Sequence, residues 1–174
     1  MGGEMRAKIG VGVVLLTAFF VGAANAKTEV LASSGAWDAF GGTTTNDKPV
    51  CGISTSPEGK YFGLKSFSGR DTFTIQISVK EWKVKDKSKY PLTMRFDTRR
   101  QWIATGTGMH FPDGDPGLEY DIVKGELDTF MREFANSKQV AIQFKQKGYA
   151  PLRLDIADVG AIVDKFTSCN RDMK

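Results

Sequence analysis

Four carboxylates gathered in one short segment are the side chains best suited to chemistry. They are Asp113, Asp115, Glu119 and Asp121. Their oxygens are the hard ligands that calcium prefers, although the spacing departs from the twelve-residue calcium loop, because Gly117 stands at the fifth position and Lys124 at the twelfth. Two of them facing a cleft about 5 to 10 Å apart would suit a hydrolase that cleaves sugars. A turn rich in Asp, Gly and Pro also arises for purely conformational reasons.

The sequence has too few suitable residues for a histidine-assisted nucleophile or for a zinc site. His110 is the one histidine, and the hydroxyls nearest to it, Thr105 and Thr107, have no G-x-S-x-G context that would mark a nucleophile. One histidine and two cysteines are too few for a typical zinc site. We therefore expect His110 to be a solvated loop residue, and we predict a protein without catalytic residues, cofactor or metal, with calcium at the four carboxylates as the weaker alternative.

Two cysteines, Cys51 and Cys169, lie far apart in the chain. A disulfide between them would close a loop worth roughly 4 to 5 kcal/mol on the chain-entropy model. Two buried free thiols, or a bridge to a second chain, are the alternatives. An exported chain favours the intramolecular disulfide, because bridges persist in oxidising compartments.

The first 26 residues have the layout of a secretory signal peptide. Arg6 and Lys8 precede an apolar run over residues 11–23, and Ala24-Asn25-Ala26 offers small side chains at the positions that signal peptidase reads. The run is too short for a membrane-spanning helix, which needs roughly twenty apolar residues. We predict cleavage after Ala26, a periplasmic or secreted location, and no transmembrane segment after processing.

Residues 27–174 have a size typical of one globular domain. The formal net charge of the whole chain is +4, which is too mild to predict a nucleic-acid partner. The tryptophans Trp37, Trp82 and Trp102 are expected in the core, and they are candidates for a recognition surface only if they prove exposed.

Apolar and polar residues alternate over most of the chain, as in half-buried strands. The pattern predicts strands over residues 36–40, 50–53, 61–67, 73–79, 92–96, 101–105, 140–144 and 152–156. Residues 27–34 are expected to be a polar segment that precedes the first strand. Residues 41–48 are expected to form a turn, and the glycines of residues 106–108 are expected to interrupt regular structure. Two prolines and two glycines oppose regular structure in residues 110–117.

Helical spacing occurs twice, in the C-terminal half. Apolar side chains recur at three- and four-residue intervals over residues 127–134 and again over residues 159–166. The order of elements predicts a mostly β (α+β) fold, an antiparallel β-sandwich or open barrel with two flanking amphipathic helices.

The layout resembles the invasion-associated locus B proteins of α-proteobacteria. The resemblance is carried by Gly35-Ala36-Trp37, the early Cys51, the strand patterns Val140-Ala141-Ile142-Gln143-Phe144 and Leu152-Arg153-Leu154-Asp155-Ile156, and the amphipathic segment 159–166. It implies a β-rich, non-enzymatic protein of the periplasm or outer membrane that is connected with host-cell contact or envelope integrity.

The expected function is therefore that of an exported interaction protein whose partner is a protein or another envelope component. Two alternatives stay open. One is an inhibitor of a lysozyme-like enzyme, which would use the rigid loop at residues 110–117. The other is an envelope hydrolase built on the carboxylates named above.

Overall fold

The computed structural model describes residues 26–173. The predicted signal peptide, apart from Ala26, lies outside the described residues, and cleavage after Ala26 stays a prediction. The strands are β1 (Lys27–Ser34), β2 (Trp37–Thr43), β3 (Pro49–Thr55), β4 (Lys60–Phe67), β5 (Thr72–Val79), β6 (Lys89–Phe96), β7 (Gln101–His110), β8 (Pro116–Val123), β9 (Gln139–Phe144) and β10 (Leu152–Asp155). The α-helices are α1 (Leu127–Ala135), which follows a short 3-10 turn, and α2 (Gly160–Asp172).

All ten strands belong to one sheet in the order β1-β2-β3-β4-β5-β8-β7-β6-β9-β10. Each neighbouring pair is antiparallel. The outermost strands, β1 and β10, do not pair with each other, so the sheet is not closed. The predicted mostly β, antiparallel fold with two helices towards the C-terminus is confirmed.

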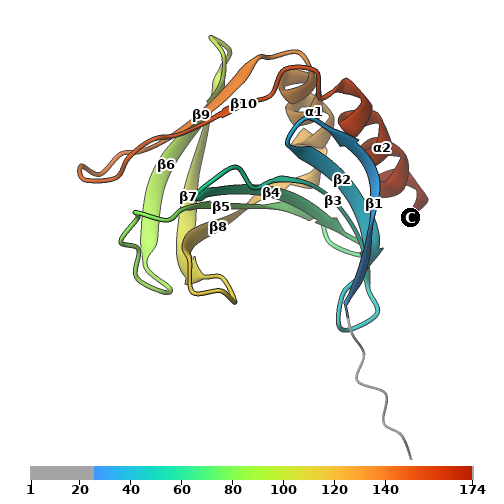
Figure 1. The fold of residues 1–174 in the computed structure, drawn as a ribbon, viewed down its shortest axis with the longest axis horizontal. Helices are drawn as coiled ribbons and strands as arrows, with labels where there is room; N and C mark the ends of the chain where they lie inside the picture. Colours follow the sequence, from blue (N-terminus) through green and yellow to red (C-terminus); the bar gives the residue numbers. More distant parts are fainter. Residues whose placement is uncertain (1–25, 174) are drawn as a thin grey trace, which may run out of the picture.

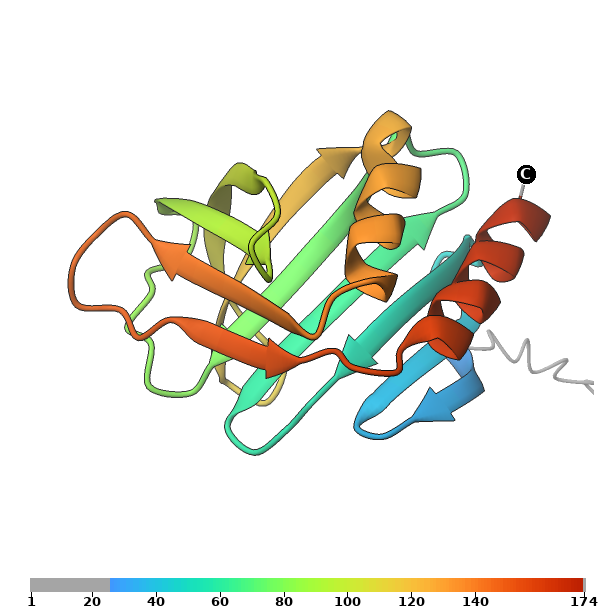
Figure 2. The same ribbon diagram turned by 90° about the horizontal axis from the view of Figure 1, so that it is seen from above.

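The sheet curls, so that its last two strands, the β9–β10 hairpin, lie over the face of β2 to β5 on which the two helices also lie (Figures 1 and 2). Helix α2 packs against β1, β2 and β3. The aromatic residues of α1 stand at the centre of the core, where the rings of Phe130 and Phe96 are 5.1 Å apart and those of Phe134 and Trp37 are 5.2 Å apart. Edge-to-face pairs of this kind add to the hydrophobic stabilisation of the core.

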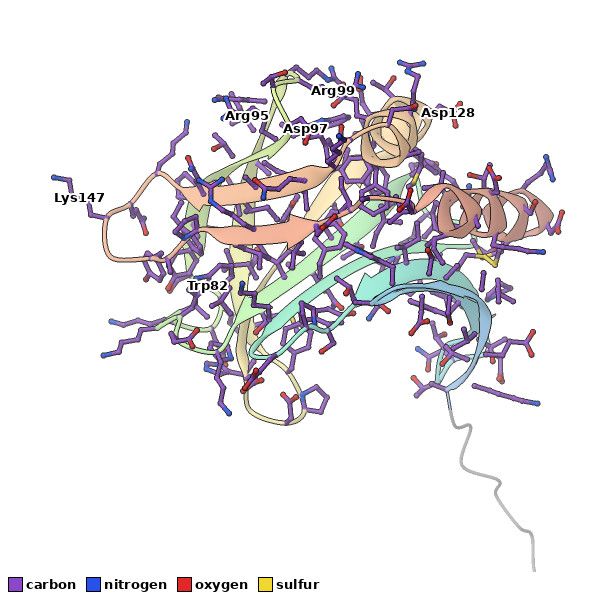
Figure 3. The ribbon with its side chains drawn as sticks, turned by 45° about the horizontal axis from the view of Figure 1, so that its top comes forward. Trp82, Arg95, Asp97, Arg99, Asp128 and Lys147 are labelled. Carbon is purple, nitrogen blue, oxygen red and sulfur yellow. A yellow bond between two sulfur atoms is a disulfide. The ribbon has the colours of Figure 1, made fainter. Side chains whose placement is uncertain are left out.

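All three tryptophans are buried, as predicted, with exposed fractions of 4%, 4% and 9% for Trp37, Trp82 and Trp102. Each indole N–H has an acceptor. Trp37 donates to the carbonyl of Asp155 and Trp82 to that of Ala150, both at 2.9 Å, so the two side chains fasten the β9–β10 hairpin over the sheet. Trp82 is labelled in Figure 3.

Two strands were not expected, and two others extend further than expected. Residues 27–34 form β1 rather than a polar segment ahead of the first strand, because they pair with β2 along its whole length. For the same reason β2 runs on to Thr43, and β7 continues through residues 106–108 to His110. Strand β8 was missed altogether. Its alternation of buried Leu118 and Tyr120 with exposed Glu119 and Asp121 is a strand pattern, but the carboxylates suggested a ligand loop instead.

Candidate binding groove

The disulfide joins the start of the sheet to the end of the chain. Cys51 on β3 and Cys169 on α2 are bonded, with their Cα atoms 5.9 Å apart. Cys51 is fully buried, and Cys169 is packed against the core. The bridge therefore fastens α2 to the core face of the sheet and leaves the opposite face uncovered.

That opposite face, here called the outer face, carries aromatic rings over glycines. The ring of Phe40 on β2 occupies the space above Gly52 on β3, so that a Cβ added to Gly52 would collide with the ring. Tyr61 covers Gly63 on β4 in the same way. Aromatic side chains spread over strand glycines in this manner compensate for the missing side chain.

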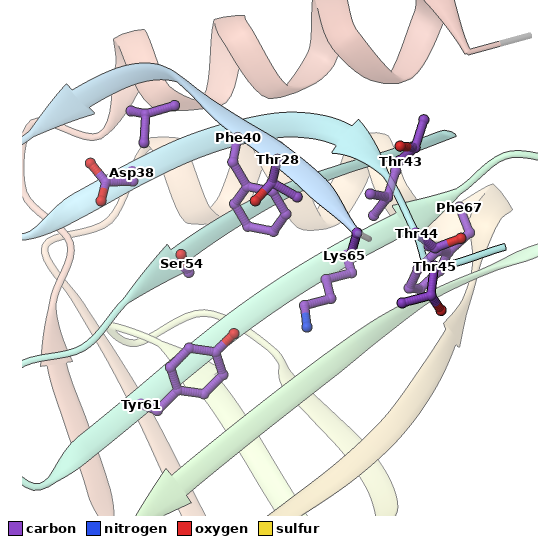
Figure 4. A pocket seen from close by; sticks show the side chains of 13 residues that line it. Thr28, Asp38, Phe40, Thr43, Thr44, Thr45, Ser54, Tyr61, Lys65 and Phe67 are labelled. Atoms are coloured by element: carbon purple, nitrogen blue, oxygen red, sulfur yellow. The ribbon is translucent and has the colours of Figure 1, made fainter. Parts of the chain in front are cut away.

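Two adjoining cavities lie on the outer face and together form what we call the groove. The first has a volume of about 540 Å³ and lies over β1 to β4 (Figure 4). The second has a volume of about 570 Å³ and extends towards the β7–β8 turn. Tyr61 and Lys65 of β4 line both cavities. Volumes of this size are typical of sites for small molecules.

The groove is lined by aromatic rings, hydroxyls and a few charges. The aromatic lining residues are Phe40, Tyr61, Phe67 and Phe111, and the hydroxyl residues include Thr28, Thr43, Thr45, Ser54, Ser56 and Ser78. The rings of Tyr61 and Phe111 meet edge to face at 5.2 Å. This contact ties the β7–β8 turn to the floor of the groove.

Lys65 lies at the centre of the groove. Its Nζ donates a 2.8 Å hydrogen bond to Gln76 Oε1, and Gln76 Nε2 in turn donates to Glu119 Oε2 at 2.7 Å. Burial lowers the pKa of Lys65, and the negative charge of Glu119 partly offsets that effect. Burial likewise raises the pKa of Tyr61 beside it. Partly desolvated polar groups in a concavity interact more strongly with a ligand than exposed groups do.

The four carboxylates singled out by the sequence are not assembled into one centre. Glu119 binds Gln76, while Asp121 accepts a 2.7 Å hydrogen bond from Thr74, and both carboxylates are exposed on β8. Asp113 caps the backbone N–H of Asp115 at 3.1 Å within the β7–β8 turn. None has the apolar burial that turns a carboxyl group into a general acid. In residues 26–173, no three His, Cys, Asp or Glu side chains are grouped to hold a metal ion.

His110 ends β7 at the surface, where its Nδ1 is 2.7 Å from the carboxylate of Asp86. Both side chains are exposed. The loop that follows is a tight turn in which Phe111 N–H donates to the Asp115 carbonyl at 2.9 Å. The turn forms a wall of the groove, because the Phe111 ring covers Gly117 and meets Tyr61.

One charged cluster was missed by the sequence reasoning. Glu133 of α1 is buried and accepts a 2.8 Å hydrogen bond from Trp102 Nε1. Arg100 lies 4.1 Å above the Trp102 ring and reaches Glu133 at 3.3 Å and Glu126 at 2.7 Å. Glu133 is not one of the apolar residues whose spacing marks residues 127–134 as a helix. Its burial follows from the Trp102 N–H, which needs an acceptor, and the cluster holds α1 against the β6–β7 hairpin.

The described chain is thus a mostly β protein with one open antiparallel sheet, a disulfide-fastened C-terminal helix and a groove on its free face. None of its described helices is both long and apolar enough to cross a membrane.

The same fold occurs in a solved structure, the crystal structure of invasion associated protein B from Bartonella henselae. The match has a TM-score of 0.52 at 10% sequence identity and covers 80% of this chain and 97% of that one. The structural relationship to invasion-associated proteins that the sequence pattern suggested is therefore confirmed at the level of the fold. No family model and no curated protein sequence matches the chain.

Proposed function

We propose that this chain is an exported, non-enzymatic binding protein of the periplasm or cell exterior, and that it holds a protein or another envelope component in the groove. The groove is the observation that carries the proposal. It combines apolar rings with a small number of polar groups, which is the usual make-up of a recognition site. The fold likeness to a protein described as invasion associated agrees with a role at the cell envelope or in host contact.

The non-enzymatic part of the proposal is supported by the side chains of the described residues. Glu119 and Asp121 are exposed and hydrogen-bonded to Gln76 and Thr74, and His110 faces a surface carboxylate rather than a nucleophile. General acid–base work needs a group whose pKa is tuned by its surroundings. A binding role requires no such group.

For the architecture we propose the open-barrel description over the sandwich. Its support is the continuity of the sheet, since hydrogen bonds link all ten strands in one series. Two separate sheets facing each other would define a sandwich.

Site-specific photocrosslinking in living cells tests the groove. A photoreactive amino acid at Ser54, inside the first cavity, should give a discrete adduct with the partner. The matched control carries the same amino acid at Lys147, in the β9–β10 loop (Figure 3), which lines neither cavity. Equal adducts at both positions, or none at Ser54, would contradict groove binding.

Export is tested separately by mass spectrometry of the protein isolated from cells. The expected N-terminus is Lys27 in a fraction released from the periplasm or the medium. A chain that still begins at Met1 in the cytoplasm would refute the export part of the proposal.

A further inference from the structure

We propose that the ligand of the groove is an uncharged, linear oligosaccharide. This inference rests on the proposed function and deepens it by naming the chemical class of the partner. Its basis is the combination of flat aromatic platforms, hydroxyl groups and nearly balanced charge over a floor of fully paired strands.

Two aromatic rings form platforms in the first cavity. The rings of Phe40, Tyr61 and Phe111 each lie close to a glycine, as shown by the collision that a Cβ on that glycine would make. The view into the first cavity shows the rings of Phe40 and Tyr61 broadside (Figure 4), whereas the Phe111 ring is inclined by 68° to that of Tyr61 and forms a side wall. A sugar ring has an apolar face made of C–H groups, and such a face stacks on an aromatic ring, where the quadrupole of the ring and dispersion both favour contact.

The polar groups between the rings suit sugar hydroxyls. The first cavity has the hydroxyls of Thr28, Thr43, Thr45 and Ser54 along its lining. The ammonium group of Lys65 uses one hydrogen bond on Gln76, whereas an ammonium can donate three. Hydroxyls both donate and accept, so they can exchange paired hydrogen bonds with the hydroxyl edge of a sugar.

The charge of the groove favours a neutral ligand. Two lysines, Lys60 and Lys65, and three aspartates, Asp38, Asp113 and Asp115, line the two cavities. These opposite charges nearly cancel. A nucleic acid or a strongly acidic glycan would need an excess of positive charge, which the lining does not provide.

A peptide fits the groove less well than a glycan. An extended peptide gains affinity by pairing its backbone with an exposed strand edge, and a helical peptide needs an apolar trough. Strands β3 and β4, at the floor, are paired on both sides along their length, so a ligand that lies on the floor is recognised through side chains. The free edge beside the groove is that of β1, whose Thr28 and Val30 line the first cavity. A peptide strand paired with β1 would reach only the first cavity, because no residue of β1 lines the second.

The two cavities adjoin at Tyr61 and Lys65, which gives the groove an elongated form. Each cavity has the volume of a small-molecule site. A linear chain of several sugars would fill both and would place its middle residue on Tyr61.

The test is binding of the processed protein, residues 27–174, to a printed panel of linear glycans, both neutral and acidic. It is followed by NMR titration with the neutral oligomer that binds best. We expect binding to neutral glycans, with the largest amide shifts on β2 to β4. Tyr61→Ala should weaken binding about tenfold or more, as expected for the loss of a stacking contact, whereas Tyr61→Phe should keep most of it. Ile103→Ala, at an exposed apolar residue of β7 outside both cavities, is the matched control and should bind normally.

The NMR spectrum of each variant shows whether it is folded. Tyr61→Phe keeps the ring over Gly63, so it can still be measured if Tyr61→Ala unfolds. Binding to no glycan, to acidic glycans alone, or with shifts away from the groove overturns the inference. A discrete photoadduct at Ser54 together with no glycan binding, or with an adduct that proves to be a peptide or protein, refutes the oligosaccharide and leaves the proposed function standing. Failure of both experiments refutes both proposals.

Discussion

Replacing both Cys51 and Cys169 by alanine should cost this protein a large part of its stability. The bridge joins residues 118 positions apart. On the chain-entropy model, a loop of that length lowers the entropy of the unfolded chain by an amount worth about 5 kcal/mol at 25 °C. Domains of this size have total stabilities of about 5 to 15 kcal/mol, so we expect the melting temperature to fall by about 10 to 20 °C.

The assay is urea unfolding of the oxidised processed protein and of the double variant, followed by tryptophan fluorescence. The buried Trp37, Trp82 and Trp102 make the emission sensitive to unfolding. A reducing agent provides the control, because it should destabilise the wild-type protein and leave the double variant unchanged. Amide exchange should also accelerate in α2, which loses its covalent attachment to β3.

The reasoning would be refuted by a difference in unfolding free energy below about 1 kcal/mol, because the entropic effect of so long a loop cannot be that small unless the unfolded chain is already compact. Two free thiols in the protein isolated from cells would refute the bridge itself.

Three further predictions concern single side chains. Burial raises the pKa of Tyr120 above its ordinary value of 10.0, so above pH 10 the unfolded chain loses the phenol proton while the folded chain keeps it. The free energy of unfolding should therefore fall by about 1.4 kcal/mol per pH unit above pH 10. Tyr120→Phe should lessen this slope in urea titrations at alkaline pH. Glu133→Ala leaves the buried Trp102 N–H without its acceptor and should cost about 1 to 3 kcal/mol in urea unfolding, whereas Glu133→Gln should recover part of the loss. Gly52→Ala forces a Cβ against the Phe40 ring and against a backbone carbonyl. A loss of about 1 to 3 kcal/mol is expected in thermal melts, and an unchanged melting temperature would contradict the close packing of both groups over Gly52.

The groove could not be found from the sequence, because it depends on which face each aromatic residue takes. The strand patterns that contain Phe40 and Tyr61, and the Pro- and Gly-rich segment that contains Phe111, do not assign these rings to a face. In the folded sheet the side chains of β4 alternate, with Phe62 and Leu64 facing the core and Tyr61 facing outwards. A strand with apolar residues on both faces gives no sign of which face is covered. The glycines that alternate with these residues were the available signal, since Gly63 follows Tyr61 by two positions.

The sequence alone determined the elements whose signals are local. The period-two pattern of residues 61–79 placed the β4–β5 hairpin, and the helical spacing of residues 127–134 and 159–166 placed α1 and α2. These patterns arise because one face of an element contacts the core, and the periodicity is the same whichever element covers that face. The two cysteines, likewise, restricted the possible intramolecular bridges to one.

Only the tertiary structure decided what depends on partners distant in the chain. Strand β1 is poorly marked as an isolated segment and exists because β2 supplies its hydrogen bonds. The carboxylates of β8 became cross-strand partners of β5 rather than a ligand set, since the register placed Glu119 opposite Gln76. Register and strand order are set by packing over the whole sheet, and it is they that brought Phe40, Tyr61 and Phe111 together around Lys65.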